Sequence, residues 1–169
     1  MIAPNAQERL TQIVEPLLFW YQKNKRSLPW RDQPTPYRVW VSEIMLQQTR
    51  VEAVKPYFER FLSQLPSIEA LASCPEDRLL KLWEGLGYYS RARNLQKAAR
   101  LLVEQYGGQL PADYRQLTAL PGIGDYTAGA IASIAFGIAV PAVDGNVLRV
   151  ISRILCCGDD IGLPQTKQS

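Results

Sequence analysis

The sequence of 169 residues predicts an all-α fold. Apolar residues recur at helical spacing along most of the chain, as Leu10, Ile13 and Leu17 do near the N-terminus. β-Branched residues rarely alternate with polar ones, as they would in half-buried strands. Hydrophobic residues make up 47% of the composition, which is ample for a packed core. We therefore expect helices joined by turns and loops, with no sheet.

The helix boundaries follow from residues with known positional preferences. Thr35 is suited to cap, and Pro36 to open, the helix after the first loop. Pro56 lies inside a helical pattern, where we expect a kink. The glycines and tyrosines of residues 85–90 predict a flexible aromatic turn before a basic helix. The expected helices are 10–25, 36–49, 51–64, 67–72, 74 or 75 to 84, 91–106, 112–119, 126–132 and 144–156, with a loop over 27–36.

Composition excludes several classes of function. The chain has no histidine, which excludes a Ser-His-Asp triad, a His-ligated zinc site and acid–base catalysis by imidazole. Its three cysteines, Cys74, Cys156 and Cys157, fit neither C-x-x-C spacing nor a disulfide framework, so we expect reduced thiols. The formal charge of +3 permits binding to nucleic acid. No apolar run is long enough to span a membrane, and we expect a cytoplasmic protein.

The most informative segment is a glycine-containing turn at residues 120–126, Leu-Pro-Gly-Ile-Gly-Asp-Tyr. We expect a hairpin between two helices in which Gly122 and Gly124 leave backbone N–H groups accessible. Asp125 is expected to cap the following helix. The partial positive charge at a helix start favours phosphate, so the segment predicts a contact with a nucleic-acid backbone. The alternative is an ordinary turn between two helices.

Two carboxylates stand out as candidates for chemistry. Glu43 lies in the apolar segment 41–46, and a buried carboxyl there would keep its proton near neutral pH. Asp144 is placed to cap a helix, where backbone hydrogen bonds and the positive helix end favour the charged form. One protonated and one charged carboxyl is the arrangement that glycosidic bond cleavage uses. The alternatives are a solvent-exposed glutamate and a purely structural cap.

Four motifs occur together and in order: residues 41–51 (VSEIMLQQTRV), 82–95 (LWEGLGYYSRARNL), 120–126 (LPGIGDY) and 143–147 (VDGNV). With these motifs the chain resembles the MutY-type adenine DNA glycosylases of the helix-hairpin-helix superfamily. The resemblance implies a helix-hairpin-helix glycosylase fold, with a six-helix lobe over residues 30–137 and an incomplete second lobe formed by 1–29 and 138–169. It also implies base-excision repair, by hydrolysis of the N-glycosidic bond of adenine mispaired with 8-oxoguanine or guanine.

The resemblance further implies roles for individual residues. Glu43 would protonate adenine and later handle the proton of the attacking water. Asp144 would stabilise the positively charged sugar, including as a transient covalent adduct, and Asn146 would hold Asp144 in place. Tyr126 would form a hydrogen bond in the site, with Asp144 as one candidate partner. Endonuclease III-type relatives have a lysine at this position, so a tyrosine implies base removal without strand cleavage.

Other residues would contact the target base or fill its place in the duplex. By resemblance, Trp30, Arg31 and Leu46 would line the adenine pocket. Gln48 and Tyr88 would enter the space that the flipped base leaves.

The hairpin and the basic helix provide the remaining expected contacts. Gly122 and Gly124 would contact DNA through their backbone. The basic stretch 91–97 would either contact phosphate or form a solvated helix face. The resemblance also implies a monovalent cation held by the backbone carbonyls of Thr118, Leu120 and Ile123.

The sequence departs from the family in its cysteines. The family implies a [4Fe–4S] cluster held by four cysteines, and the three cysteines here have the wrong number and spacing. Residues 161–167 resemble the start of a further helix, so we expect a chain that stops before its second lobe is complete. Two alternatives stay open: a non-catalytic DNA-binding fragment of this fold, and an endonuclease III-like glycosylase/lyase, which Tyr126 opposes. The expected partner is double-stranded DNA with an adenine mispair, bound by a monomer of bacterial type located with the nucleoid and not on a membrane.

Overall fold

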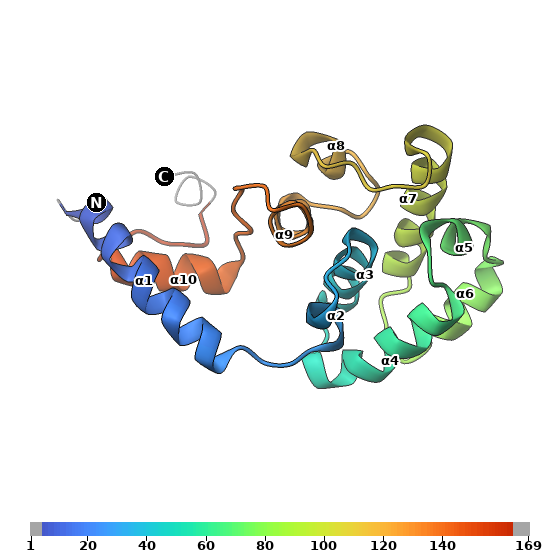
Figure 1. The fold of residues 1–169 in the computed structure, drawn as a ribbon, viewed down its shortest axis with the longest axis horizontal. Helices are drawn as coiled ribbons and strands as arrows, with labels where there is room; N and C mark the ends of the chain where they lie inside the picture. The colour runs from blue at the N-terminus through green and yellow to red at the C-terminus, as the bar shows by residue number, and fades with distance from the viewer. Residues whose placement is uncertain (1–4, 164–169) are drawn as a thin grey trace. The chain divides into compact units, whose positions relative to one another are not determined.

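A computed structural model describes residues 5–163, and the expected all-α fold is confirmed. This part of the chain contains ten helices and no strand (Figure 1). The chain divides into two units. The larger unit runs from Ser27 to Ala142, and the terminal unit combines the chain up to Arg26 with the chain from Val143 onward. The larger unit starts three residues before the lobe expected at 30–137 and ends five residues after it.

Local capping signals set several helix starts in the larger unit. The Thr35 hydroxyl accepts a hydrogen bond from the Arg38 amide at 3.4 Å, and the Ser67 hydroxyl accepts one from the Ala70 amide at 3.2 Å. Both residues are therefore N-caps. The cap at Thr35 was predicted, whereas Ser67 lies one residue before the helix that was predicted to begin with it. The helices of this unit are α2 (Pro29–Asp32), α3 (Pro36–Leu46), α4 (Val51–Gln64), α5 (Ile68–Ser73), α6 (Glu76–Trp83), α7 (Ser90–Tyr106), α8 (Tyr114–Thr118) and α9 (Asp125–Phe136).

Two predictions about residues 27–49 are wrong. The predicted loop contains the single helical turn α2, because Pro29 opens a helix without needing its missing N–H. The helix that Pro36 opens ends at Leu46 and not at Thr49, since Gln47 turns to an extended conformation. In contrast, the helix predicted over 51–64 has the observed bounds of α4.

Helix α3 lies at the centre of the larger unit, between α9 and α4 (Figure 1). Its aromatic residue Trp40 is fully buried, and Phe61 and Trp83 form an edge-to-face pair with ring centroids 6.0 Å apart. On α9, Gly129 allows close approach of the chain after that helix: a Cβ there would collide with the carbonyl oxygen of Pro141. The core of this unit therefore fixes both α3 and the segment that leaves the unit at Ala142.

The terminal unit contains α1 (Ala6–Asn24) and α10 (Gly145–Ile154). The Arg9 guanidinium donates a hydrogen bond to the Ile154 carbonyl oxygen at 3.1 Å, which links the start of α1 to the end of α10. Neither helix has a buried residue. The predicted start of a further helix at 161–167 lies mostly outside the described residues. Within the described chain, every helix is too short or too polar to cross a bilayer.

Candidate active site and nucleic-acid interface

Glu43 is a half-buried carboxylate in the buried central part of α3. Its neighbours in α3 on both sides, from Val39 to Ser42 and then Ile44 and Met45, are buried. Burial is the main cause that raises the pKa of the Glu43 carboxyl above its ordinary value. Glu43 is therefore not the solvent-exposed glutamate of the alternative interpretation.

Two side chains from other helices act on the Glu43 carboxyl in the opposite direction. Tyr126 on α9 donates a hydrogen bond to it, and Arg31 on α2 contributes a positive charge. Both lower the pKa of Glu43, but less than burial raises it. The packing of α3 against α2 and α9 thus brings together three predicted site residues. The hydrogen bond that Tyr126 makes in the larger unit goes to Glu43.

The glycine turn forms the predicted hairpin between α8 and α9. The Ile123 amide closes the turn by donating to the Leu120 carbonyl at 3.1 Å. Gly122 has φ of +78°, and a Cβ at this position would lie 2.9 Å from the Cβ of Asn94 on α7. Glycine is therefore required at position 122 for both conformation and space. Gly122 and Gly124 are solvent-exposed, and Leu120 and Ile123 are buried.

The prediction that Asp125 caps α9 is wrong by one residue. Gly124 is the N-cap, and no side chain completes the cap. Asp125 is the first helical residue, where its carboxylate accepts a hydrogen bond from the Tyr114 hydroxyl at 3.2 Å. The start of α9 consequently has backbone amides without a capping side chain.

Asp144 caps α10, as predicted. One of its carboxylate oxygens accepts a hydrogen bond from the Val147 amide at 2.8 Å, and the other accepts one from the Asn146 side-chain amide at 3.0 Å. The hydrogen bond from the Val147 backbone is the largest cause that lowers the pKa of Asp144, and the Asn146 bond acts in the same direction. Asp144 is therefore held in its charged form.

The remaining predicted contact residues differ in exposure. Gln48 and Tyr88 are exposed, and both have positive φ, 57° and 46°. Trp30 is only 5% exposed and packs edge-on against the ring of Phe58, with centroids 5.4 Å apart, so most of its surface belongs to the core. Leu46, at the end of α3, is half-buried.

The expectation of a basic, solvated or phosphate-binding face over 91–97 is only partly met. Arg93 and Lys97 are exposed, and Arg93 pairs with Glu76 at 2.7 Å. Arg91 and Gln96 are buried. The burial of Arg91 was not predicted, because most of its partners are backbone carbonyls, which no pattern of side chains in the sequence indicates.

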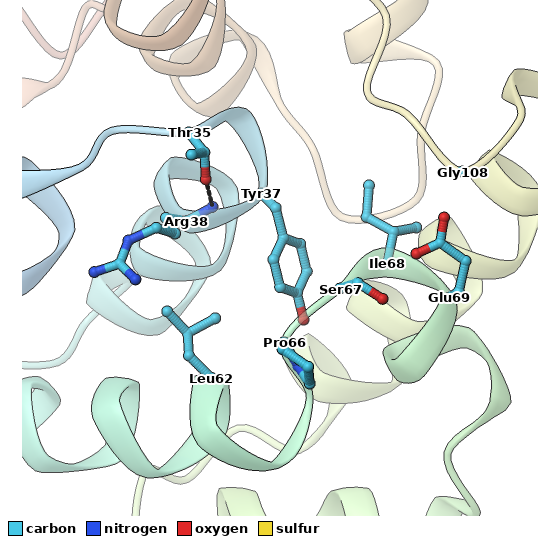
Figure 2. Close-up of a pocket in the computed structure, with 9 residues that line it drawn as sticks. All are labelled: Thr35, Tyr37, Arg38, Leu62, Pro66, Ser67, Ile68, Glu69 and Gly108. Carbon is cyan, nitrogen blue, oxygen red and sulfur yellow. Dashed lines mark hydrogen bonds between the residues drawn. The ribbon is translucent and has the colours of Figure 1, made fainter.

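A cavity of about 380 Å³ lies elsewhere in the larger unit and involves none of the predicted site residues. Figure 2 shows the Tyr37 ring pointing from α3 toward the turn between α4 and α5, where its hydroxyl donates to the Leu65 carbonyl at 2.8 Å. Burial raises the pKa of the Tyr37 hydroxyl above its ordinary value. The cavity is lined by Thr35, Tyr37, Arg38, Leu62, Pro66, Ser67, Ile68, Glu69 and Gly108.

The cysteines do not fit an iron–sulfur cluster. Cys74 is buried in the larger unit, whereas Cys156 and Cys157 follow α10 in the terminal unit. Cys156 accepts a hydrogen bond from Arg9 at 3.1 Å, and Cys157 donates one to Asp159 at 3.5 Å. Such clusters require four ligands, and residues 5–163 contain no group of three or more histidine, cysteine or acidic side chains that could hold a metal ion. No step of the chemistry below depends on such a cluster.

The sequence matches the HhH-GPD superfamily of base excision DNA repair proteins over residues 41–169. It is 49% identical over 153 residues to the adenine DNA glycosylase of Mus musculus, an alignment that covers 85% of the chain and 30% of the mouse protein. It is 46% identical over 138 residues to the adenine DNA glycosylase of Buchnera aphidicola, covering 81% of the chain and 39% of that protein. The chain thus spans about a third of the length of these curated relatives.

Two solved structures have the same fold as this chain. A thermostable thymine-DNA glycosylase superimposes with a TM-score of 0.82 at 30% identity, over 88% of this chain and 69% of the other. An endonuclease III, solved in a non-covalent complex with DNA, gives a TM-score of 0.79 at 25% identity, over 99% and 77%. These similarities confirm the fold that the four motifs imply.

Proposed function

Because the chain belongs to the helix-hairpin-helix (HhH-GPD) superfamily of base excision DNA repair proteins, we propose that it removes adenine from DNA mispairs. The reaction is hydrolysis of the N-glycosidic bond of adenine opposite 8-oxoguanine or guanine. Its substrate is double-stranded DNA, bound by a monomer in the compartment that holds the chromosome, the cytoplasm of a bacterial cell. The relatives of highest identity named above are adenine DNA glycosylases, which supports adenine as the target base.

The observation that carries this proposal is the surroundings of Glu43. Burial raises its pKa, and the hydroxyl of Tyr126 keeps the carboxyl oriented from α9. A carboxyl with a raised pKa keeps its proton to higher pH and can give that proton to a ring nitrogen of adenine as the C–N bond breaks. The carboxylate that results then accepts a proton from the water that attacks the sugar.

Asp144 supplies the negative charge that the reaction needs in addition to a proton. Loss of adenine leaves positive charge on the sugar, and a fixed negative charge near that sugar stabilises it. The hydrogen bonds from Val147 and Asn146 keep the Asp144 carboxyl ionised and hold its orientation. We therefore assign the proton to Glu43 and the charge to Asp144.

Tyr126 favours base removal without strand cleavage. A lyase of this superfamily needs an amine that forms an imine with the sugar, and a phenol cannot form one. In this chain the Tyr126 hydroxyl is a hydrogen-bond donor to Glu43, which is a positioning role. The proposed product is consequently an intact strand with an abasic site.

The hairpin and two exposed side chains supply the contacts with DNA. The amides around Gly122 and Gly124 precede the N-terminus of α9, where a phosphate is favoured. Adenine must leave the base stack before its glycosidic bond is reached, and Gln48 and Tyr88 are the residues that we assign to the vacated space.

A single-turnover assay tests the proposal. Excess protein is incubated with an end-labelled duplex that contains one adenine opposite 8-oxoguanine, and each time point is divided between neutral and hot alkaline treatment. We expect strand breaks only after alkali, since alkali cleaves abasic sites. Breaks without alkali, together with a protein–DNA adduct trapped by borohydride, would identify a lyase instead. Binding without any base loss would identify a non-catalytic DNA-binding fragment, an outcome that the partial coverage of the relatives makes worth measuring directly.

A further inference from the structure

We infer that Arg91 is a positioning residue that sets the conformations of both turns carrying Gln48 and Tyr88, and so fixes these two side chains relative to each other. The inference rests on the proposed function, in which the two side chains enter the base stack. Arg91 is the second residue of α7 and is only 9% exposed. A guanidinium is rarely so buried without polar partners, and in Arg91 both terminal nitrogens have them, whereas Nε has no hydrogen-bond partner.

One terminal nitrogen of Arg91 binds the end of α3. Its Nη1 donates to the carbonyl oxygens of Ile44 at 3.0 Å, Met45 at 3.0 Å and Gln47 at 2.5 Å. Carbonyls in the last turn of a helix have no partner within that helix and carry partial negative charge, which suits a cation. Arg91 therefore binds the C-terminal end of α3, which lies two residues before Gln48.

The other terminal nitrogen binds the second turn. Its Nη2 donates to the carbonyl oxygens of Leu86 at 2.9 Å and Gly87 at 3.2 Å, and to the Thr49 hydroxyl at 3.3 Å. One rigid, planar group thus bonds the residues on both sides of Gln48 and the two residues before Tyr88. The guanidinium carbon also lies 5.6 Å from the centroid of the Tyr88 ring.

The backbone conformation of both turns requires stabilising contacts such as those of Arg91. Gln48 and Tyr88 adopt φ of 57° and 46°, a left-handed conformation that residues with side chains rarely adopt. Strain of this kind persists only where surrounding contacts hold it. Both side chains are solvent-exposed, and Tyr88 is 63% exposed, so little packing of their own keeps them in place. The hydrogen bonds of Arg91 are the contacts that the two turns share.

The test compares Arg91→Met with Gln96→Met in the full chain. Gln96 is a matched control, because it is buried on the same helix and also donates to two carbonyls, those of Leu71 and Cys74, but in a different part of the unit. The first readout is hydrogen exchange of the Thr49 and Leu86 amides, which close the two turns by donating to Leu46 and Trp83. The second is the fluorescence of 2-aminopurine placed beside adenine mispaired with 8-oxoguanine, which rises when bases unstack.

We expect Arg91→Met to speed exchange at both amides roughly ten- to a hundredfold and to reduce the fluorescence rise, while Arg91→Lys restores part of each. Gln96→Met is expected to lower the melting temperature without either change. A uniform change in exchange across the larger unit, or equal effects of the two Met variants on the turns, would overturn the inference. Faster amide exchange in Arg91→Met together with a normal rise in fluorescence would also overturn the inference. If the unmodified chain produced no unstacking, the proposed function would fail, and the exchange data would still decide whether Arg91 fixes the turns.

Discussion

Glu43 and Asp144 have similar carboxyl groups in opposite surroundings. Glu43 lies in the middle of α3, where the backbone amides are already bonded within the helix, and burial dominates its titration. Asp144 lies at the start of α10, where free amides turn toward its carboxylate. The pKa of the first is raised and that of the second is lowered. Burial in the middle of one helix and hydrogen bonds at the start of another therefore shift the two pKa values in opposite directions.

This difference matters for the proposed reaction because the two steps need different species. A leaving base needs a proton, and an electron-poor sugar needs a negative charge. Two carboxyls with the same pKa could not supply both at one pH. Substituting either carboxyl, or the tyrosine bonded to Glu43, therefore tests the comparison.

Glu43→Gln is expected to have the largest effect. The amide keeps the size and the acceptor oxygen of the side chain but has no acidic proton to transfer, so base release should slow by about 10²–10⁴-fold or more. DNA affinity should stay near that of the parent, because the hairpin and both turns are unchanged. Single-turnover rates and a gel-shift titration measure the two quantities. Adenine release at the parent rate would remove Glu43 from the proposed role.

Two substitutions of Asp144 distinguish the effect of its charge from the effect of its helix cap. Asparagine is as good an N-cap as aspartate, so Asp144→Asn should keep the cap and lose only the charge, slowing base release by about 10²–10³-fold. Asp144→Ala loses both, and should also destabilise the chain by about 0.5–2 kcal/mol. Rates and urea unfolding of both variants give the comparison. If the alanine variant were slow and the asparagine variant fast, Asp144 would be a structural cap only.

Local sequence patterns predicted part of the difference between Glu43 and Asp144. The caps at Asp144 and Thr35 and the bounds of α4 depend on residues a few positions apart, and local signals predicted them. The burial of Glu43 was one of two alternatives, since an apolar helix segment does not reveal which neighbours cover it. Only the packing of α9 on α3 brings Tyr126 to Glu43.

The wrong predictions arose from contacts with residues elsewhere in the chain and from ambiguous local patterns. The early end of α3 depends on an arginine more than forty residues further along the chain, so no local pattern could indicate it. The one-residue error at Asp125 arose because the carboxylate has a competing partner, the hydroxyl of Tyr114. Helix α2 was missed because the turn-forming residues of its segment are equally typical of a loop.

The two carboxyls should also give opposite pH dependences of stability. A raised pKa means that the folded state binds the Glu43 proton more tightly than the unfolded chain, so stability falls as pH rises from the ordinary glutamate range through the folded pKa. Glu43→Gln should therefore become more stable than the parent as pH rises over this range.

A lowered pKa at Asp144 stabilises the fold above the unfolded pKa, and this gain is lost as pH falls through the folded pKa. Asp144→Asn should be the less stable protein near neutral pH and equal to the parent in acid. The free energy of unfolding of both variants and the parent, measured in urea from about pH 3 to about pH 7, tests both predicted directions.

The smallest expected effect is a shift in the pH dependence of catalysis. The Tyr126 hydroxyl lowers the pKa of Glu43 by bonding its charged form, so Tyr126→Phe should let that pKa rise further. If protonated Glu43 is the acid, the alkaline fall in the single-turnover rate should then move to higher pH. Tyr114→Phe is the matched control, because it removes a hydroxyl that bonds Asp125 in the same region and leaves the surroundings of Glu43 unchanged. A shift toward lower pH in Tyr126→Phe, or the same shift in both variants, would mean that the fall reports a group other than Glu43. A shift confined to Tyr126→Phe would tie the rate to the protonation of this one carboxyl.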